Sequence, residues 1–184
     1  MKKSIVFLLV LLVALSVSVS MACVGKTIHL GISSSNEKLM AEMASLMISE
    51  RTGSSVKIEV YKDTKSLYEA VRQGKLNIIM ENTDRALDVL GKPKSGTASP
   101  VDLIKSEYRK TYNMTWLSPF GNAPQYAPVL TSDTLANYPA LPKLLNKLSG
   151  VLTSDTYAKL AKTAESDDKA RKVAKEFLKS KKLI

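Results

Sequence analysis

The sequence predicts an α/β domain with a mainly parallel β-sheet flanked by helices and a helical C-terminal part. Short β-type runs alternate with helical runs in β-α-β-α-β order over residues 27–80, and helical spacing continues from residue 131 to the end. Strands that alternate with helices are typical of a parallel sheet, because each crossover returns the chain to the same edge.

The strand candidates are short runs that are either apolar or alternating. Residues 27–32 form the first run, and residues 56–61 alternate apolar and polar side chains, as a half-buried strand does. Residues 76–80 form an apolar run, interrupted only by Asn77, that has the length of a buried strand. Two further runs, 114–117 and 125–130, complete the expected sheet.

The helices begin and end at recognisable signals. Ser34 and Glu37 form a capping box before a helix that ends at Thr52-Gly53. Gly74 stops a shorter helix over residues 67–73. The remaining helices are expected at residues 84–90, 100–112 and 141–148, and after Thr153 and Ser166, with a Pro/Gly/Ser-rich loop over 91–99.

Residues 1–22 are predicted to be a cleavable secretory signal peptide. Lys2 and Lys3 precede an uncharged stretch over residues 5–17, which is too short for a stable membrane span. Ser20 and Ala22 place small residues before the expected cleavage site. An uncleaved N-terminal anchor is the alternative. The mature chain is then a single domain over residues 23–184, located in the periplasm or cell envelope.

The single cysteine, Cys23, falls at the predicted new N-terminus. One thiol cannot form an internal disulfide. Two interpretations stay open: Cys23 is lipidated and tethers the protein to a membrane, or ordinary cleavage after Ala22 leaves a terminal thiol.

The mature chain is basic. Without Lys2 and Lys3 it has 25 basic and 17 acidic residues, a net charge of +8. In a cytoplasmic protein such a charge would suggest nucleic-acid binding. Export argues against nucleic acid and favours a surface that meets anionic lipid or an acidic partner protein.

The sequence contains no recognisable catalytic motif. It lacks the P-loop, the dinucleotide fingerprint and the Gly-x-Ser-x-Gly elbow. The one histidine, His29, lies inside the first predicted strand, where a structural role is favoured, and no Cys/His metal cluster is available. We therefore predict a non-enzymatic protein without a metal or cofactor.

Polar turns follow three successive strands. Residues 33–36 follow the first strand, 81–85 follow the run 76–80, and 118–126 form a third polar turn. Ligands of open α/β sheets bind at the carboxyl ends of strands, so these turns could converge on one cleft. A polar helix cap at Asn82 or Thr83 is the alternative for the second turn.

Several stretches resemble the osmoprotectant-binding proteins, the glycine betaine/choline (OpuAC-type) substrate-binding proteins of ABC importers. Residues 27–36, 64–78 and the Glu81-x-Thr83 motif are similar to the start of that family. Residues 108–121, YRKTYNMTWLSPFG, are similar to its KKYNLVWLDPLG segment, and residues 138–155 and 173–184 resemble its end.

The resemblance implies a periplasmic-binding-protein-like fold, whose lobes close on a ligand, and an aromatic cage for a quaternary ammonium. The chain departs from the family because one lobe is missing and because Asn82 stands where an aromatic residue is common. Tyr126 lies where the family places a cage tyrosine. The side chains expected to line the cleft are Ser34, Asn36, Asn82, Thr83, Asn122 and Tyr126.

Two functions follow. The first is the extracytoplasmic substrate-binding component of an importer for glycine betaine/choline-like solutes, which implies a membrane-embedded transporter subunit and allows a homodimer that sandwiches the ligand. The second is a repurposed single-lobe protein–protein interaction module of the envelope that does not bind a small ligand tightly.

Overall fold

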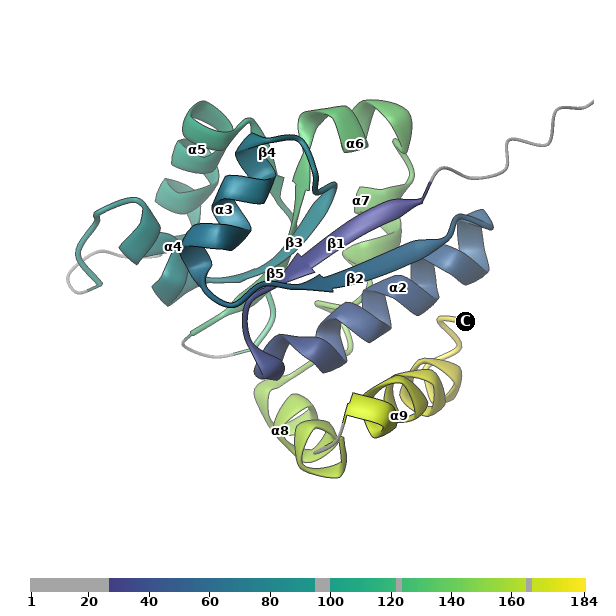
Figure 1. Ribbon diagram of the computed structural model, residues 1–184. Coiled ribbons are helices and arrows are strands. Elements are labelled where there is room, and N and C mark those ends of the chain that lie inside the picture. The colour runs from purple at the N-terminus through teal and green to yellow at the C-terminus, as the bar shows by residue number, and fades with distance from the viewer. Residues whose placement is uncertain (1–26, 95–99, 122–123, 165–166) are drawn as a thin grey trace, which may run out of the picture.

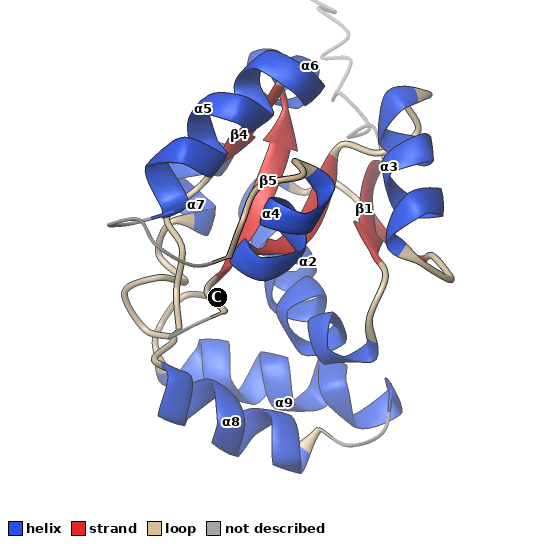
Figure 2. Ribbon diagram, turned by 90° about the vertical axis from the view of Figure 1, so that its left-hand side faces the viewer, coloured by secondary structure: helices blue, strands red, loops and turns tan. Residues whose placement is uncertain are grey.

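The fold is a five-stranded sheet with helices on both faces (Figures 1 and 2). The computed structural model describes residues 27–94, 100–121, 124–164 and 167–184. The predicted signal peptide, Cys23 and Asn122 lie outside the described residues. None of the described helices is both long and apolar enough to cross a membrane.

The strand order is β2-β1-β3-β5-β4. β1 pairs in parallel with β2 and β3, whereas β5 runs antiparallel to both of its neighbours, β3 and β4. Four of the five strands therefore point the same way, and the mainly parallel sheet is confirmed. The strands are β1 (Ile28–Ile32), β2 (Val56–Val60), β3 (Ile78–Asn82), β4 (Met114–Trp116) and β5 (Tyr126–Thr131).

The helices also follow the predicted order, with two differences. A short helix at residues 132–137 was not predicted as a separate element, and the stripe 141–148 is helical only over its first five residues. The helices are α2 (Lys38–Thr52), α3 (Thr64–Arg72), α4 (Thr83–Val89), α5 (Pro100–Tyr112), α6 (Ser132–Asn137), α7 (Leu141–Leu145), α8 (Ser154–Thr163) and α9 (Asp167–Ser180).

The capping box differs in detail from the prediction. Ser34 Oγ accepts from the Asn36 N–H at 3.3 Å and caps a 3₁₀ turn (Ser35–Glu37) rather than the α-helix itself. The Glu37 side chain accepts from the Ser33 N–H at 3.0 Å. Glu37 is buried, so its carboxylate is available to partners inside the fold.

Each face of the sheet has its own apolar core. On one face, β1 side chains such as Leu30 pack with α2, α7 and α9. On the other, Ile79 and Val129 pack with α3, α4 and α5. Successive residues Ile78 and Ile79 belong to different cores, as the alternation along a strand requires.

Gly31 marks a close approach between sheet and helix. A Cβ at this position would lie 2.5 Å from Leu76 Cδ1 and 2.7 Å from Leu67 Cδ1. The absence of a side chain thus lets α3 pack directly on β1.

Candidate functional site

The carboxyl ends of β1 and β3 and the start of β5 meet at one edge of the sheet. Asn82, the last residue of β3, pairs with Tyr126, the first residue of β5. Just beyond the strands, the Thr83 N–H donates to the Gln125 carbonyl at 2.9 Å, and Thr83 Oγ1 accepts from the Gln125 N–H at 3.1 Å. Two of the polar turns predicted to converge, 81–85 and 118–126, therefore lie together.

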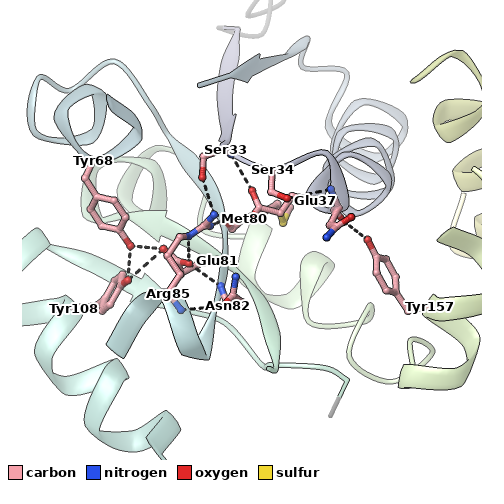
Figure 3. A network of polar contacts seen from close by, with 11 residues as sticks. Ser33, Ser34, Glu37, Tyr68, Met80, Glu81, Asn82, Arg85, Tyr108 and Tyr157 are labelled. Atoms are coloured by element: carbon pink, nitrogen blue, oxygen red, sulfur yellow. Dashed lines mark hydrogen bonds and ion pairs between the residues drawn. The ribbon is translucent and has the colours of Figure 1, made fainter. Parts of the chain in front are cut away.

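A largely buried guanidinium, 12% exposed, joins two of these turns (Figure 3). Arg85 Nε donates to Glu81 Oε1 at 2.5 Å, and Arg85 Nη1 donates to Glu37 Oε1 at 2.5 Å and to Ser33 Oγ at 2.7 Å. Its Nη2 donates to the Met80 carbonyl at 2.5 Å. One cation thus holds the segment after β1 against the end of β3.

Two tyrosines satisfy the other oxygen of Glu81. The hydroxyls of Tyr68 on α3 and Tyr108 on α5 contact one another, and both donate to Glu81 Oε2. Since Glu81 is 0% exposed, these bonds replace the water that its carboxylate would otherwise bind. The network reaches from α3 and α5 through Glu81 and Arg85 to Glu37, in the 3₁₀ turn before α2.

Burial decides the titration of this network. Burial raises the pKa of Glu81 and of Glu37, although the positive charge of Arg85 opposes the rise in both. Burial also works against ionised Arg85, but the charges of Glu81 and Glu37 outweigh it and raise its pKa. Tyr68 and Tyr108 have pKa values raised by burial and by the Glu81 charge, so both hydroxyls remain protonated donors.

An aromatic wall lies at the same edge. The rings of Tyr126 and Tyr157 have centroids 6.2 Å apart and planes inclined by 35°. Together with buried Phe120, they line a hollow of about 230 Å³ between β5 and α8. The Tyr157 hydroxyl donates to the Asn36 carbonyl, which ties α8 to the turn after β1 (Figure 3).

The side chains predicted to line the cleft have several local roles. Asn82 Oδ1 caps α4 by accepting from the Arg85 N–H at 2.9 Å, so this residue has the helix-cap role that was the alternative to ligand binding. The Thr83 side chain is buried. Asn36 borders a second hollow of about 270 Å³ that also includes Tyr157, and Tyr126 lines the aromatic one. Ser34 caps the 3₁₀ turn.

Sequence reasoning placed Ser33 and Arg85 in the polar turns but not among the cleft-lining side chains, and it missed Glu37 and Tyr157 as residues of this edge. The i,i+4 spacing of Glu81 and Arg85 was a usable signal for an ion pair, which in the structure joins β3 to the first turn of α4. No local pattern relates Tyr157 to Tyr126, because they meet only after α8 packs beside β5.

The geometry suits the binding of a small cation. Aromatic faces attract cations, and the hollow is smaller than the roughly 300–1,000 Å³ of sites for drug-sized ligands. The described residues hold no cluster of three or more His, Cys, Asp or Glu side chains that could ligate a metal ion. His29 instead contacts Glu59 Oε1 through Nδ1 at 2.6 Å, in the structural role expected of it.

Comparison with solved structures shows the class of fold. The chain superposes with a TM-score of 0.73 on a glycine betaine/carnitine/choline ABC transporter structure and on apo YehZ from Escherichia coli. Each superposition covers 86% of this chain and 99% of the solved chain, at 13% sequence identity. The fold is that of the periplasmic-binding-protein class, here with a single sheet in the described residues.

The family resemblance is confirmed in the C-terminal part. Residues 110–180 match the family model of the substrate-binding domain of the ABC-type glycine betaine transport system, OpuAC. This match runs from the end of α5 to the end of α9 and supports a substrate-binding, non-enzymatic role. The resemblance of residues 27–83 lies outside it. No curated protein sequence matches the chain.

Proposed function

We propose that this chain is the extracytoplasmic substrate-binding component of an ABC-type importer, and that it takes a small quaternary-ammonium solute of the glycine betaine/choline class. The observation that carries this proposal is the aromatic wall formed by Tyr126 and Tyr157. A quaternary ammonium has no N–H to donate, so aromatic faces are its natural partners. Phe120 completes the apolar lining.

The charges around the wall favour a cation. Burial is the largest cause of the raised pKa values of Tyr126 and Tyr157, and the negative charge of Glu37 raises both further. At Tyr126 the positive charge of Arg85 opposes this rise. A negative potential that disfavours a phenolate stabilises a cation at the same place. The Arg85 guanidinium is occupied by Glu81 and Glu37, so it offers little to a ligand carboxylate. Choline should therefore bind at least as tightly as glycine betaine.

One lobe sets a limit on affinity. Two partly exposed rings supply about 1–2 kcal/mol of cation–π attraction, whereas micromolar binding requires about 8 kcal/mol. We expect millimolar affinity for the chain alone. A second surface that covers the hollow, from a second copy of the chain or from the transporter's membrane subunit, would tighten binding.

Export belongs to the same proposal. Substrate-binding proteins of ABC importers are extracytoplasmic, which agrees with the predicted signal peptide over residues 1–22. Lipidation of Cys23 would keep the domain beside its transporter. Mass spectrometry of the mature N-terminus distinguishes an acylated Cys23 from a free thiol.

Titration of the purified protein with choline, glycine betaine and carnitine tests ligand binding. Calorimetry and thermal shift should show saturable binding in the millimolar range. The uncharged choline analogue 3,3-dimethyl-1-butanol is the matched control, since it keeps the shape and loses the charge, and it should bind more weakly. Absence of heat and of a thermal shift with all three cations at millimolar concentration rejects the receptor function for the chain alone.

The second candidate is a single-lobe interaction module of the envelope. The completeness of the buried network favours it, because Arg85 already has protein partners for Nε, Nη1 and Nη2. A module should capture a defined membrane protein in a pull-down without added solute. A receptor should capture a transporter subunit in a solute-dependent way.

A further inference from the structure

Exposed cations gather at the end of the molecule opposite the candidate site. Arg51, Lys143 and Lys147 border one shallow hollow of about 270 Å³ between the end of α2 and α7. Arg51 also donates to the Leu183 carbonyl from Nε at 3.2 Å and from Nη2 at 3.1 Å. That contact brings the C-terminal segment to the same place. We call this surface the basic end, and its cations are Arg51, Lys143, Lys147, Lys181 and Lys182.

The cations of the basic end are not neutralised within the fold. All five are exposed, and none lies within 4.0 Å of a carboxylate in the part of the chain that the structure describes. Lys38 and Lys110, in contrast, lie 3.9 and 3.7 Å from Glu42 and Glu107. The unpaired cations thus project a positive field into solvent.

The basic end coincides with the start of the described chain. The Ile28 N–H donates to the Ser55 carbonyl at 2.8 Å, three residues beyond the end of α2. Figure 1 shows the start of β1, the end of α2 and the C-terminus on the same side, away from the strand ends that carry the candidate site. The 26 residues that precede Thr27 therefore join the domain at this end.

We propose that the basic end docks on the surface of an anionic phospholipid bilayer. Cations that lie without acidic partners match a negatively charged plane, and each Lys or Arg at such a surface raises the affinity for the membrane about fivefold. Docking in this orientation directs the carboxyl edge of the strands, with Tyr126 and Tyr157, away from the lipid. The candidate site then stays open to solutes while the domain rests on the membrane.

Vesicle co-sedimentation tests the docking. The full chain is expressed with its own leader and purified after export with Cys23→Ser, so that no acyl group contributes. Phosphatidylglycerol/phosphatidylcholine vesicles are compared with pure phosphatidylcholine vesicles. We expect binding to the anionic vesicles only, and loss of binding as salt rises from low to about physiological concentration and above.

A charge-reversed pair supplies the decisive comparison. Lys143→Glu/Lys147→Glu should weaken binding to anionic vesicles about 25-fold or more. Lys62→Glu/Lys65→Glu has the same net charge but lies beyond β2 at the opposite edge, and it should stay within about twofold of the parent. Circular dichroism checks that both variants fold.

Three results overturn the proposal. Equal losses in the two variants would show a response to net charge alone. Unchanged binding by Lys143→Glu/Lys147→Glu would place the contact elsewhere. Absence of binding to anionic vesicles, with charge-dependent capture of an acidic envelope protein instead, would show that the basic end serves a protein partner.

Discussion

Tyr157, on α8, lies with its ring centroid 6.2 Å from that of Tyr126, the first residue of β5. The ring planes are inclined by 35° to one another, and the Tyr157 hydroxyl donates to the Asn36 carbonyl, which holds this ring beside the turn after β1. Two aromatic rings thus lie together at this place, where the sequence analysis singled out only Tyr126.

Replacing Tyr157 by alanine should weaken choline binding about fivefold, since one cation–π partner is worth roughly 1 kcal/mol. Tyr157→Phe keeps the ring and loses only the hydroxyl bond to the Asn36 carbonyl. It should bind choline within about twofold of the parent. NMR titration measures both dissociation constants. Equal losses in the two variants would assign the effect to the hydroxyl bond instead of the ring.

Arg85→Met should destabilise the fold strongly. It leaves Glu37 and Glu81 buried without their shared cation, a situation that costs about 3–5 kcal/mol. Arg171→Met is the matched control, because it breaks an ion pair with Glu42 in which the arginine is 58% exposed, and it should cost less than about 1 kcal/mol. Urea denaturation gives both free energies of unfolding. Similar values for the two variants would contradict the importance of burial.

Glu81→Gln should change how stability depends on pH. Burial raises the pKa of Glu81 in the folded chain above its ordinary value of 4.5. Between pH 4.5 and the raised pKa, the folded chain binds more protons at Glu81 than the unfolded chain does. The contribution of Glu81 to the free energy of unfolding is therefore greatest below pH 4.5 and declines as pH rises through this window. Glutamine cannot titrate, and its variant should lack this decline.

Denaturation of parent and Glu81→Gln at several pH values between 4 and 7 measures the difference. The stability of the parent relative to the variant should fall as pH rises. A difference that stays constant would show that the charges around Glu81 cancel the effect of its burial, and a difference that grows with pH would show that they outweigh it.

Gly31→Ala should destabilise the fold by about 1–3 kcal/mol, the usual cost of overpacking a filled core. The new methyl group would lie 2.5 Å from Leu76 Cδ1 and 2.7 Å from Leu67 Cδ1, so these buried side chains, or the elements that carry them, must shift. Gly150→Ala is the control, since its nearest neighbour is 3.6 Å away, and its unfolding midpoint should be nearly unchanged. Equal midpoints for the two variants would indicate that Leu67 and Leu76 rearrange freely.

Most elements could be predicted from the sequence because their signals are local. The helix that ends at Thr52 is followed by Gly53 at φ 68°, a conformation that glycine adopts without strain. The alternation predicted over residues 56–61 corresponds to the edge strand β2. The apolar run predicted over residues 76–80 overlaps the central strand β3. The positions where the short helices α6 and α7 begin and end were harder to predict. Short helices depend on tertiary packing more than on propensity.

The sequence by itself indicated the mainly parallel sheet, because helices between successive strands favour parallel pairing, and it located three polar turns that could converge. It did not indicate that β5 is antiparallel to its neighbours. Only the tertiary structure decided which side chains meet there. Arg85 contacts Glu37, which is 48 residues away in the sequence, because the turn following β1 packs against the end of β3. Tyr157 lies beside Tyr126, 31 residues away, because α8 packs near the start of β5. Such pairs depend on the packing of distant elements, and no periodicity in the chain encodes them.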